Sequence, residues 1–264
     1  ASAGAIAFSD DGSPATNSRL MRQALEYSHD LNLPIIDHCE DTALSQGGVM
    51  NEGTTSTKLG LPGIPNAAED IIVARDLALT RLTRGRLHIA HVSSEGSVGL
   101  IRRAKEKGIM VTAEVTPLHL TLTEESVIVH ATNAKVNPPL RTRKDIQALI
   151  QGLKEGVIDI IVTDHAPHTE ADKMLKFALA PPGISSLETA LGSLMSLVHA
   201  GQITLTTLVA KLTREPAKII GNKYGKPGTL AIGAPADITI FDPDMDWEVD
   251  TRAFTSKGKN TPLA

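Results

Sequence analysis

The chain has 264 residues, a formal net charge of -4 at pH 7, and aromatic side chains at only 3% of its positions. It therefore has neither a basic surface to neutralise phosphates nor enough rings to stack on bases, and we expect no nucleic-acid partner. No apolar run reaches the roughly 20 residues that cross a bilayer, and the single cysteine, Cys39, cannot form an internal disulfide, which together favour a soluble, cytoplasmic enzyme with no membrane partner.

Short apolar runs alternate with segments of helical periodicity, which predicts strand–helix units around a parallel sheet. The expected strands cover residues 4–8, 33–37, 86–92, 110–115 and 157–162. The expected helices cover residues 17–31, 67–82, 97–107, 143–154, 186–199 and 205–220. A closed (β/α)8 TIM-type barrel has eight such units, so the five found here predict an α/β fold with a partial barrel.

Local signals mark the ends of several elements. Asn17 or Ser18 can cap the first helix, and Gly108 suits a left-handed cap after the third. The glycine-rich loop at 47–63 is long enough to be functional. After the fourth strand the chain reaches NPPLR at 137–141, where two prolines exclude regular structure.

The composition changes near Lys226. Residues 228–244, GTLAIGAPADITIFDPD, alternate short apolar runs with glycine and proline turns, which is typical of strands in a small antiparallel unit. We therefore expect two domains, with residues 1–225 forming a partial barrel and residues 226–264 forming part of a small β-sandwich.

Acids and histidines follow four of the expected strands. His38 and His91 end the second and third strands, Asp164 follows the fifth in TDHAPH, and Asp10 and Asp11 follow the first in FSDDG. Because the carboxyl ends of parallel strands share one end of a barrel, these side chains should converge. Imidazole and carboxylate are ligands for zinc-like ions, and a pair of ions needs a bridging anion, for which we favour Asp11. The sequence thus predicts a metal site.

Taken singly, each of these residues has an ordinary alternative role. A histidine at a strand end is more often a hydrogen-bonded structural residue, SDDG is a common turn sequence, and Asp164 could cap its own turn. Their joint placement at strand ends favours the metal site over these separate roles.

Other polar residues near the expected site have different predicted roles. His168, beyond a rigid Ala-Pro step, is expected to face substrate. Asn137 offers a donor and an acceptor to an amide-bearing substrate, or is simply a turn residue before proline. Cys39 is expected to be a small buried apolar residue rather than a nucleophile, and His88 a structural histidine on the face opposite His91.

The motifs FSDDG, IIDHCE, LHIAHVS, NAKVNPPLR and TDHAPHT, in this order and spacing, resemble the class I dihydroorotases of the amidohydrolase superfamily. The resemblance runs from about residue 4 to residue 263. It implies a zinc site with two ions per subunit that reversibly hydrolyses dihydroorotate to N-carbamoyl-L-aspartate in pyrimidine biosynthesis. The metal ligands implied by the resemblance are Asp11, His38, His91 and Asp164. Asp164 would also be catalytic and transfer the proton.

The resemblance further implies that Asn137, His168 and the backbone around Pro182 and Gly183 hold the substrate. The family's His-x-His pair and its substrate-binding arginine are not found in this chain. We therefore expect a fragment that lacks the N-terminal strands and is inactive or weakly stable alone. A homodimer or a complex with aspartate transcarbamoylase is the implied assembly.

Three other interpretations remain open. Dihydropyrimidinases and allantoinases usually have lysine where FSDDG lies, so Asp11 argues against them. A non-catalytic scaffold for aspartate transcarbamoylase should have lost its ligands, which are present here. A metal-binding fold without hydrolase activity is the third, and manganese or cobalt could bind the same ligand set as zinc.

Overall fold

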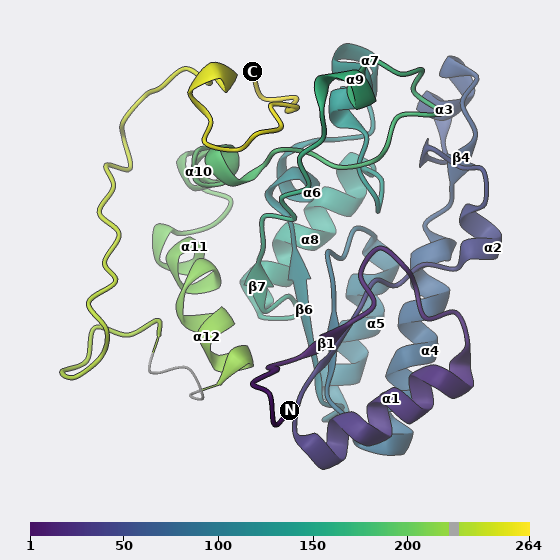
Figure 1. Ribbon diagram of the computed structural model, residues 1–264, viewed down its shortest axis with the longest axis vertical. Coiled ribbons are helices and arrows are strands. Elements are labelled where there is room, and N and C mark those ends of the chain that lie inside the picture. The colour runs from purple at the N-terminus through teal and green to yellow at the C-terminus, as the bar shows by residue number, and fades with distance from the viewer. Residues whose placement is uncertain (222–226) are drawn as a thin grey trace.

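A parallel sheet of five short strands forms the centre of the computed structural model, which describes residues 1–221 and 227–264 (Figure 1). The strands follow one another in the order β1-β2-β5-β6-β7, and each pair of neighbours is parallel. Their bounds are β1 (Phe8–Ser9), β2 (Ile35–Asp37), β5 (Leu87–Ile89), β6 (Val111–Val115) and β7 (Ile160–Ile161). These are five consecutive units of the α/β barrel that the sequence predicted.

The helices that connect these strands pack side by side against the sheet (Figure 1). They are α1 (Ser18–Leu31), α4 (Ala67–Thr83), α5 (Glu95–Glu106) and α8 (Arg143–Glu155), close to the predicted bounds. Asn17 caps α1 by accepting two backbone N–H groups, and Gly108 has the predicted left-handed conformation after α5. Among the described residues, no helix is both long and apolar enough to cross a membrane.

The main hydrophobic core lies between these helices and the sheet. Strand β6 shows how it is built, because Val111, Ala113 and Val115 are buried while Thr112 and Glu114 are half-buried. This alternation turns the apolar side chains toward the helices and leaves the polar ones on the opposite face of the sheet.

The strands are shorter than the apolar runs that predicted them. Leu33, Ala90 and Val92 are buried although they lie outside the strand ladder. Burial therefore continues into the connecting loops, so apolar character alone overestimates strand length.

Two predicted helices are interrupted. Residues 205–220 form α11 (Leu205–Leu212) and α12 (Arg214–Ile220), separated at Thr213. Pro216 explains the break, because its ring lacks an N–H and would clash with the carbonyl group of Leu212 in a continuous helix. Residues 186–199 form the 3-10 turn η2 (Leu187–Thr189) followed by α10 (Ala190–His199).

The long loops carry short elements that the sequence did not predict. The glycine-rich loop contains a two-stranded parallel sheet, and the segment after β6 contains two short helices. A second, smaller hydrophobic cluster packs these loops together. The elements of the loops are α2 (Thr42–Ser45), β3 (Met50–Asn51), α3 (Thr54–Leu59), β4 (Gly63–Ile64), α6 (Pro117–Thr121), α7 (Ser126–His130), η1 (Ala131–Ala134), α9 (Glu170–Lys173) and η4 (Thr251–Ala253).

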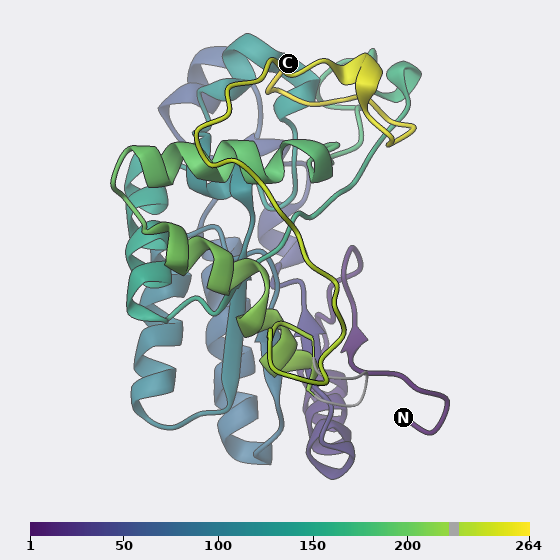
Figure 2. The same ribbon diagram turned by 90° about the vertical axis from the view of Figure 1, so that its left-hand side faces the viewer.

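The predicted strands of the C-terminal unit are wrong. Residues 228–244 form no strand and run as an extended segment past the side of the helices (Figures 1 and 2). Leu230, Ile232, Ile238 and Ile240 are all exposed, so no second layer among the described residues covers this apolar stripe. A strand without such a layer gains little stability. The predicted boundary at Lys226 lies outside the described residues, and the division into two domains stays a prediction.

Candidate metal centre

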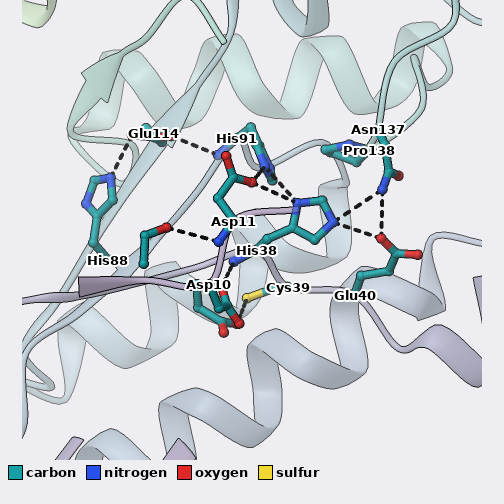
Figure 3. Close-up of polar contacts among 12 residues, drawn as sticks. Asp10, Asp11, His38, Cys39, Glu40, His88, His91, Glu114, Asn137 and Pro138 are labelled. Atoms are coloured by element: carbon teal, nitrogen blue, oxygen red, sulfur yellow. Dashed lines mark hydrogen bonds and ion pairs between the residues drawn. The ribbon is translucent and has the colours of Figure 1, made fainter. Parts of the chain in front are cut away.

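Three side chains meet beyond the carboxyl ends of β1, β2 and β5 (Figure 3). Nδ1 of His38 lies 2.9 Å from Nε2 of His91, and Oδ1 of Asp11 lies 3.4 Å and 3.3 Å from these two nitrogens. One ligand atom from each residue lies within 4.8 Å of the other two. The convergence predicted from the strand ends is therefore found for these three residues, and their role as ligands stays a prediction.

The fourth predicted ligand, Asp164, lies after β7 and is half-buried. It is outside the group of three, although its carboxylate interacts with the charges of His91 and Asp11. Burial raises the pKa of Asp164 above its usual value, while His91 lowers it and Asp11 raises it. The structure thus brings three predicted ligands into contact and places the fourth within reach of their charges.

The backbone is strained at two of these four positions. His91 has a φ of 29° and Asp164 a φ of 45°, in the left-handed region that residues other than glycine rarely adopt. Such conformations cost about 1–3 kcal/mol each and persist only where the surrounding structure imposes them. They occur here at the points where the chain leaves β5 and β7.

Mutual contacts shift the pKa values of Asp11, His38 and Glu40. Hydrogen bonds from His38 and His91 hold the pKa of Asp11 far below its usual range. Burial alone would lower the pKa of His38, but its contacts with Asp11 and Glu40 raise it to about 9. The contact with His38 also lowers the pKa of Glu40 to about 2. The contacts of His38 with Asp11 and Glu40 thus favour the charged forms of all three side chains.

Asp10 supports the group through hydrogen bonds to the backbone. Its Oδ1 accepts a hydrogen bond from the backbone N–H of His38 at 2.9 Å, and its Oδ2 accepts one from Ala15 at 2.6 Å. Of the two acids in FSDDG, Asp11 thus faces the histidines and Asp10 fixes the end of β2, in agreement with the preference for Asp11.

Two carboxylates of the site were missed by the sequence analysis. Oε2 of Glu40 lies 2.8 Å from Nε2 of His38, and Oε1 of Glu114 accepts from the backbone N–H of His91 at 3.3 Å. Glu114 could have been found, because a charged residue inside an apolar strand needs a partner. Glu40 follows His38 by two residues, which is a weaker signal.

The predicted substrate-binding residues lie in two places. The Nδ2 group of Asn137 donates to Oε2 of Glu40 at 2.8 Å, beside His38 (Figure 3). His168 instead contacts the carbonyl oxygen of Pro182 through Nε2 at 2.8 Å, and Gly183 packs against the same imidazole. Asn137 is therefore part of the metal-site neighbourhood, whereas the other three form a separate group.

A side chain from the C-terminal segment holds this second group together. Asn260 accepts a hydrogen bond from the backbone N–H of His168 and donates one to the carbonyl oxygen of Gly183, both at 2.8 Å. A cavity of about 570 Å³ lies next to it and is lined in part by His168, Lys173 and Lys257. The space beside His168 is large enough for a small molecule.

Cys39 and His88 are both buried, as predicted. Cys39 belongs to the main hydrophobic core, but two acids lie beside it as well, because its thiol donates to Oδ2 of Asp37 at 2.9 Å and lies near Asp76. Burial raises the pKa of this thiol well above its usual value, which makes it a poor nucleophile. His88 contacts Thr112 at 2.7 Å and Glu114 at 2.8 Å, as a structural histidine should.

Comparison with known proteins gives close relatives. The dihydroorotase of Syntrophus aciditrophicus is 56% identical over 261 residues, which make up 99% of this chain and 61% of that protein. The dihydroorotase of Pelotomaculum thermopropionicum is 54% identical over 262 residues, again 99% of this chain and 61% of the relative. This chain thus spans about three fifths of the length of these curated relatives.

Solved structures with the same architecture include hydantoinases and a dihydropyrimidinase. The L-hydantoinase (dihydropyrimidinase) of Arthrobacter aurescens matches with a TM-score of 0.86 and 28% identity, over 99% of this chain and 61% of that chain. The dihydropyrimidinase of Brevibacillus agri NCHU1002 matches with a TM-score of 0.81 and 25% identity, over 94% and 56% of the two chains. A model of the amidohydrolase family matches residues 1–262. Since this match covers nearly the whole chain, the chain belongs to the amidohydrolase family.

Proposed function

We propose that this chain carries the metal centre and part of the substrate site of a dihydroorotase, which reversibly converts dihydroorotate and water to N-carbamoyl-L-aspartate. The observation that carries the proposal is the meeting of Asp11, His38 and His91 beyond three neighbouring parallel strands. Relatives at 56% and 54% identity that are named dihydroorotase support the substrate.

The donor set fits zinc. Two imidazoles and a carboxylate are borderline ligands of the kind that zinc prefers, and their ligand atoms are close enough together to share one ion. Asp11 is partly exposed, so its second oxygen is open to a further ion, and we propose two zinc ions per subunit. When bound, zinc lowers the pKa of a coordinated water and polarises a carbonyl group.

Asp164 is proposed as the group that moves the proton. It is half-buried at the end of β7, and burial raises its pKa, which makes the carboxylate a better proton acceptor. A carboxylate in this position can accept a proton from the attacking water and return it to the leaving nitrogen. We further propose it as a metal ligand, on the resemblance of TDHAPH.

The remaining residues are proposed to hold the substrate. The side-chain amide of Asn137 can both donate to and accept from an amide ring, and it already lies beside His38 and Glu40. His168, with the backbone of Pro182 and Gly183, borders the neighbouring cavity. We place the whole protein in the cytoplasm, as a homodimer or in a complex with aspartate transcarbamoylase.

A second cyclic-amide substrate is the main alternative, because the two solved structures described above are named hydantoinase and dihydropyrimidinase. The two functions differ in the ring that is opened. Hydantoin or dihydrouracil hydrolysis without dihydroorotate hydrolysis would favour the alternative.

The experiment joins the unmatched part of the Syntrophus aciditrophicus dihydroorotase to this chain, since the chain spans 61% of that relative. We expect the zinc-loaded chimera to open the ring of dihydroorotate, and the ultraviolet absorbance of dihydroorotate measures this reaction. The 264-residue chain alone should be far less active. The His91→Ala chimera is the control for contaminating activity. A chimera that binds zinc and folds but leaves dihydroorotate intact would contradict the proposal.

A further inference from the structure

The turn that follows His91 determines where its imidazole lies. His91 leaves β5 with a φ of 29°, and residues 92–94 carry the chain from there to the start of α5 at Glu95. Because an imidazole moves with its backbone, the strained turn has to be held from outside if the ring is to stay beside His38 and Asp11.

Glu114 of β6 accepts the backbone N–H of His91 at one end of this turn, and Glu69 of α4 holds the other end. The side chain of Glu69 is only 5% exposed, and its two carboxylate oxygens accept the backbone N–H of Ser93 at 3.1 and 3.2 Å. Oε1 also accepts the backbone N–H of Ser94 at 3.2 Å. The hydroxyl of Ser93 donates to Oε2, whereas the hydroxyl of Ser94 lies closest to Oδ1 of Asp70, at 2.5 Å. One buried carboxylate thus accepts both backbone N–H groups of the turn and the hydroxyl of Ser93.

The charge of Glu69 is balanced through Arg141. This guanidinium is 2% exposed, and its Nε donates to the hydroxyl oxygen of Ser93 at 3.1 Å. Its other bonds go to Oδ1 of Asn51 at 2.9 Å and the carbonyl oxygen of Ile64 at 2.8 Å. A buried carboxylate is costly unless it is paired and hydrogen-bonded, and Ser93 links it to a buried cation.

The hydrogen bonds of Glu69 are not needed to cap α5. The hydroxyl of Ser94 caps this helix by accepting the N–H of Ser97 at 3.0 Å, and Asp70 accepts the hydroxyl of Ser97 at 3.0 Å. The helix start is therefore held by Ser94 and Asp70, while Glu69 additionally binds the turn that precedes it.

We propose that Glu69 is a positioning residue for the metal ligand His91. By filling the hydrogen-bonding groups of the turn, its carboxylate fixes the left-handed backbone of His91 and so the place of the imidazole. Arg141 belongs to the same segment as Asn137, so the Glu69–Ser93–Arg141 network also ties the predicted substrate segment to the metal site. The proposal rests on the metal centre proposed above.

The test compares zinc affinity and stability in variants of the chimera described above, which supplies the part that this chain lacks. Glu69→Gln keeps the side-chain volume but replaces one acceptor oxygen by a donor that faces the N–H groups of the turn. We expect zinc affinity to fall about 10–100-fold, as is usual when a residue that orients a metal ligand is lost. The visible spectrum of bound cobalt should also change, because His91 no longer holds its place.

Asp145→Asn is the matched control. Asp145 is also a buried carboxylate that accepts backbone and side-chain N–H groups, at Glu95 and Asn66, both at 2.9 Å, but it does not touch the turn. We expect this variant to lose stability while its zinc affinity and cobalt spectrum stay unchanged. Ser93→Ala removes only the hydroxyl and should give a smaller loss of affinity in a chain that still folds.

The outcomes separate this inference from the proposed function. If the unmodified chimera binds neither zinc nor cobalt, both the metal centre and the role of Glu69 are overturned. If it binds them and Glu69→Gln and Ser93→Ala bind equally well with the same spectrum, only the role of Glu69 is overturned. Reduced affinity with a changed spectrum in these variants, and not in Asp145→Asn, supports it.

Discussion

Two neighbouring histidines at β5 differ in role, because one has a structural position and the other lies in the candidate metal centre. His88 and His91 are both buried and lie three residues apart, but only His91 joins Asp11 and His38. His88 has both ring nitrogens engaged, by Thr112 and Glu114. The partners of His88 lie outside the group of three, whereas Nε2 of His91 faces Nδ1 of His38 and Oδ1 of Asp11.

This contrast gives a direct test of the metal centre. We expect His91→Ala to weaken zinc binding by about 100-fold or more, because it removes a metal ligand itself and not only a residue that orients a ligand. His88→Ala is the matched control and should destabilise the fold while changing zinc affinity by no more than a few-fold. Isothermal titration calorimetry measures both affinities. Equal affinities in the two variants would exclude His91 as a ligand.

For single residues, the sequence predicted the position of a side chain correctly where that position depended on its place along a strand. His38 and His91 could be predicted because each directly ends an apolar run, and such ends meet in a parallel sheet. Glu40 was missed because its closeness to His38 depends on loop geometry, which no local pattern encodes. Glu114 was missed although a charged residue inside an apolar strand signals a partner, and which partner it finds depends on the alignment of β5 with β6.

Among the helices, the end of α4 carries an avoidable strain. Arg84, the residue after the helix, has a φ of 58° and an exposed side chain, and its N–H bonds to the carbonyl oxygen of Thr80. A left-handed conformation costs a residue with a Cβ atom about 1–2 kcal/mol, and glycine adopts it freely.

We therefore expect Arg84→Gly to stabilise the chain by about 0.5 kcal/mol, after the greater chain entropy of glycine is subtracted. Arg81→Gly provides the matched control, because Arg81 is exposed in the last turn of the same helix. That change should instead destabilise the chain by about 1 kcal/mol. Urea unfolding measures both, and a loss of stability in both variants would refute the role of the left-handed position.

Helices could be predicted from the sequence where apolar periodicity and capping residues agreed. Elements whose formation depends on distant parts of the chain could not. The bounds of α1 and α8 follow from an apolar stripe with a capping residue in front, Asn17 and Thr142. The break at Thr213 could have been predicted from Pro216. The apolar alternation at 228–244 was misleading, because a strand forms only beside a partner and none is present among the described residues.

The stability of the whole molecule should depend on pH through a buried histidine outside the group of Asp11, His38 and His91. His119 is 2% exposed, and its Nε2–H donates to the carbonyl oxygen of Pro138 at 3.0 Å. Nδ1 accordingly accepts from the hydroxyl of Thr116 at 2.8 Å. Burial lowers the pKa of His119 from 6.5 to about 4, so the neutral ring is the form that fits the fold.

The sign of this dependence follows from proton uptake on unfolding. Between pH 6.5 and 4 the unfolded chain binds a proton that the folded chain excludes, so stability falls as the pH drops through this window. The full loss from His119 is about 3 kcal/mol, and above pH 6.5 its contribution is complete.

Urea unfolding at a series of pH values between 7.5 and 4 should show this loss, and His119→Gln should flatten the curve. His29→Gln, which replaces an exposed histidine, serves as the control and should leave the curve as steep as before. An unchanged slope in His119→Gln would show that other groups cause the acid sensitivity.

The order in which the strands pair also has a kinetic consequence. His91 is 53 residues from His38 and 80 from Asp11, so the three come together only after β1, β2 and β5 have aligned. Such long-range pairings are slow to form. We therefore expect an ion bound by these residues to slow unfolding and to leave the rate of folding unchanged.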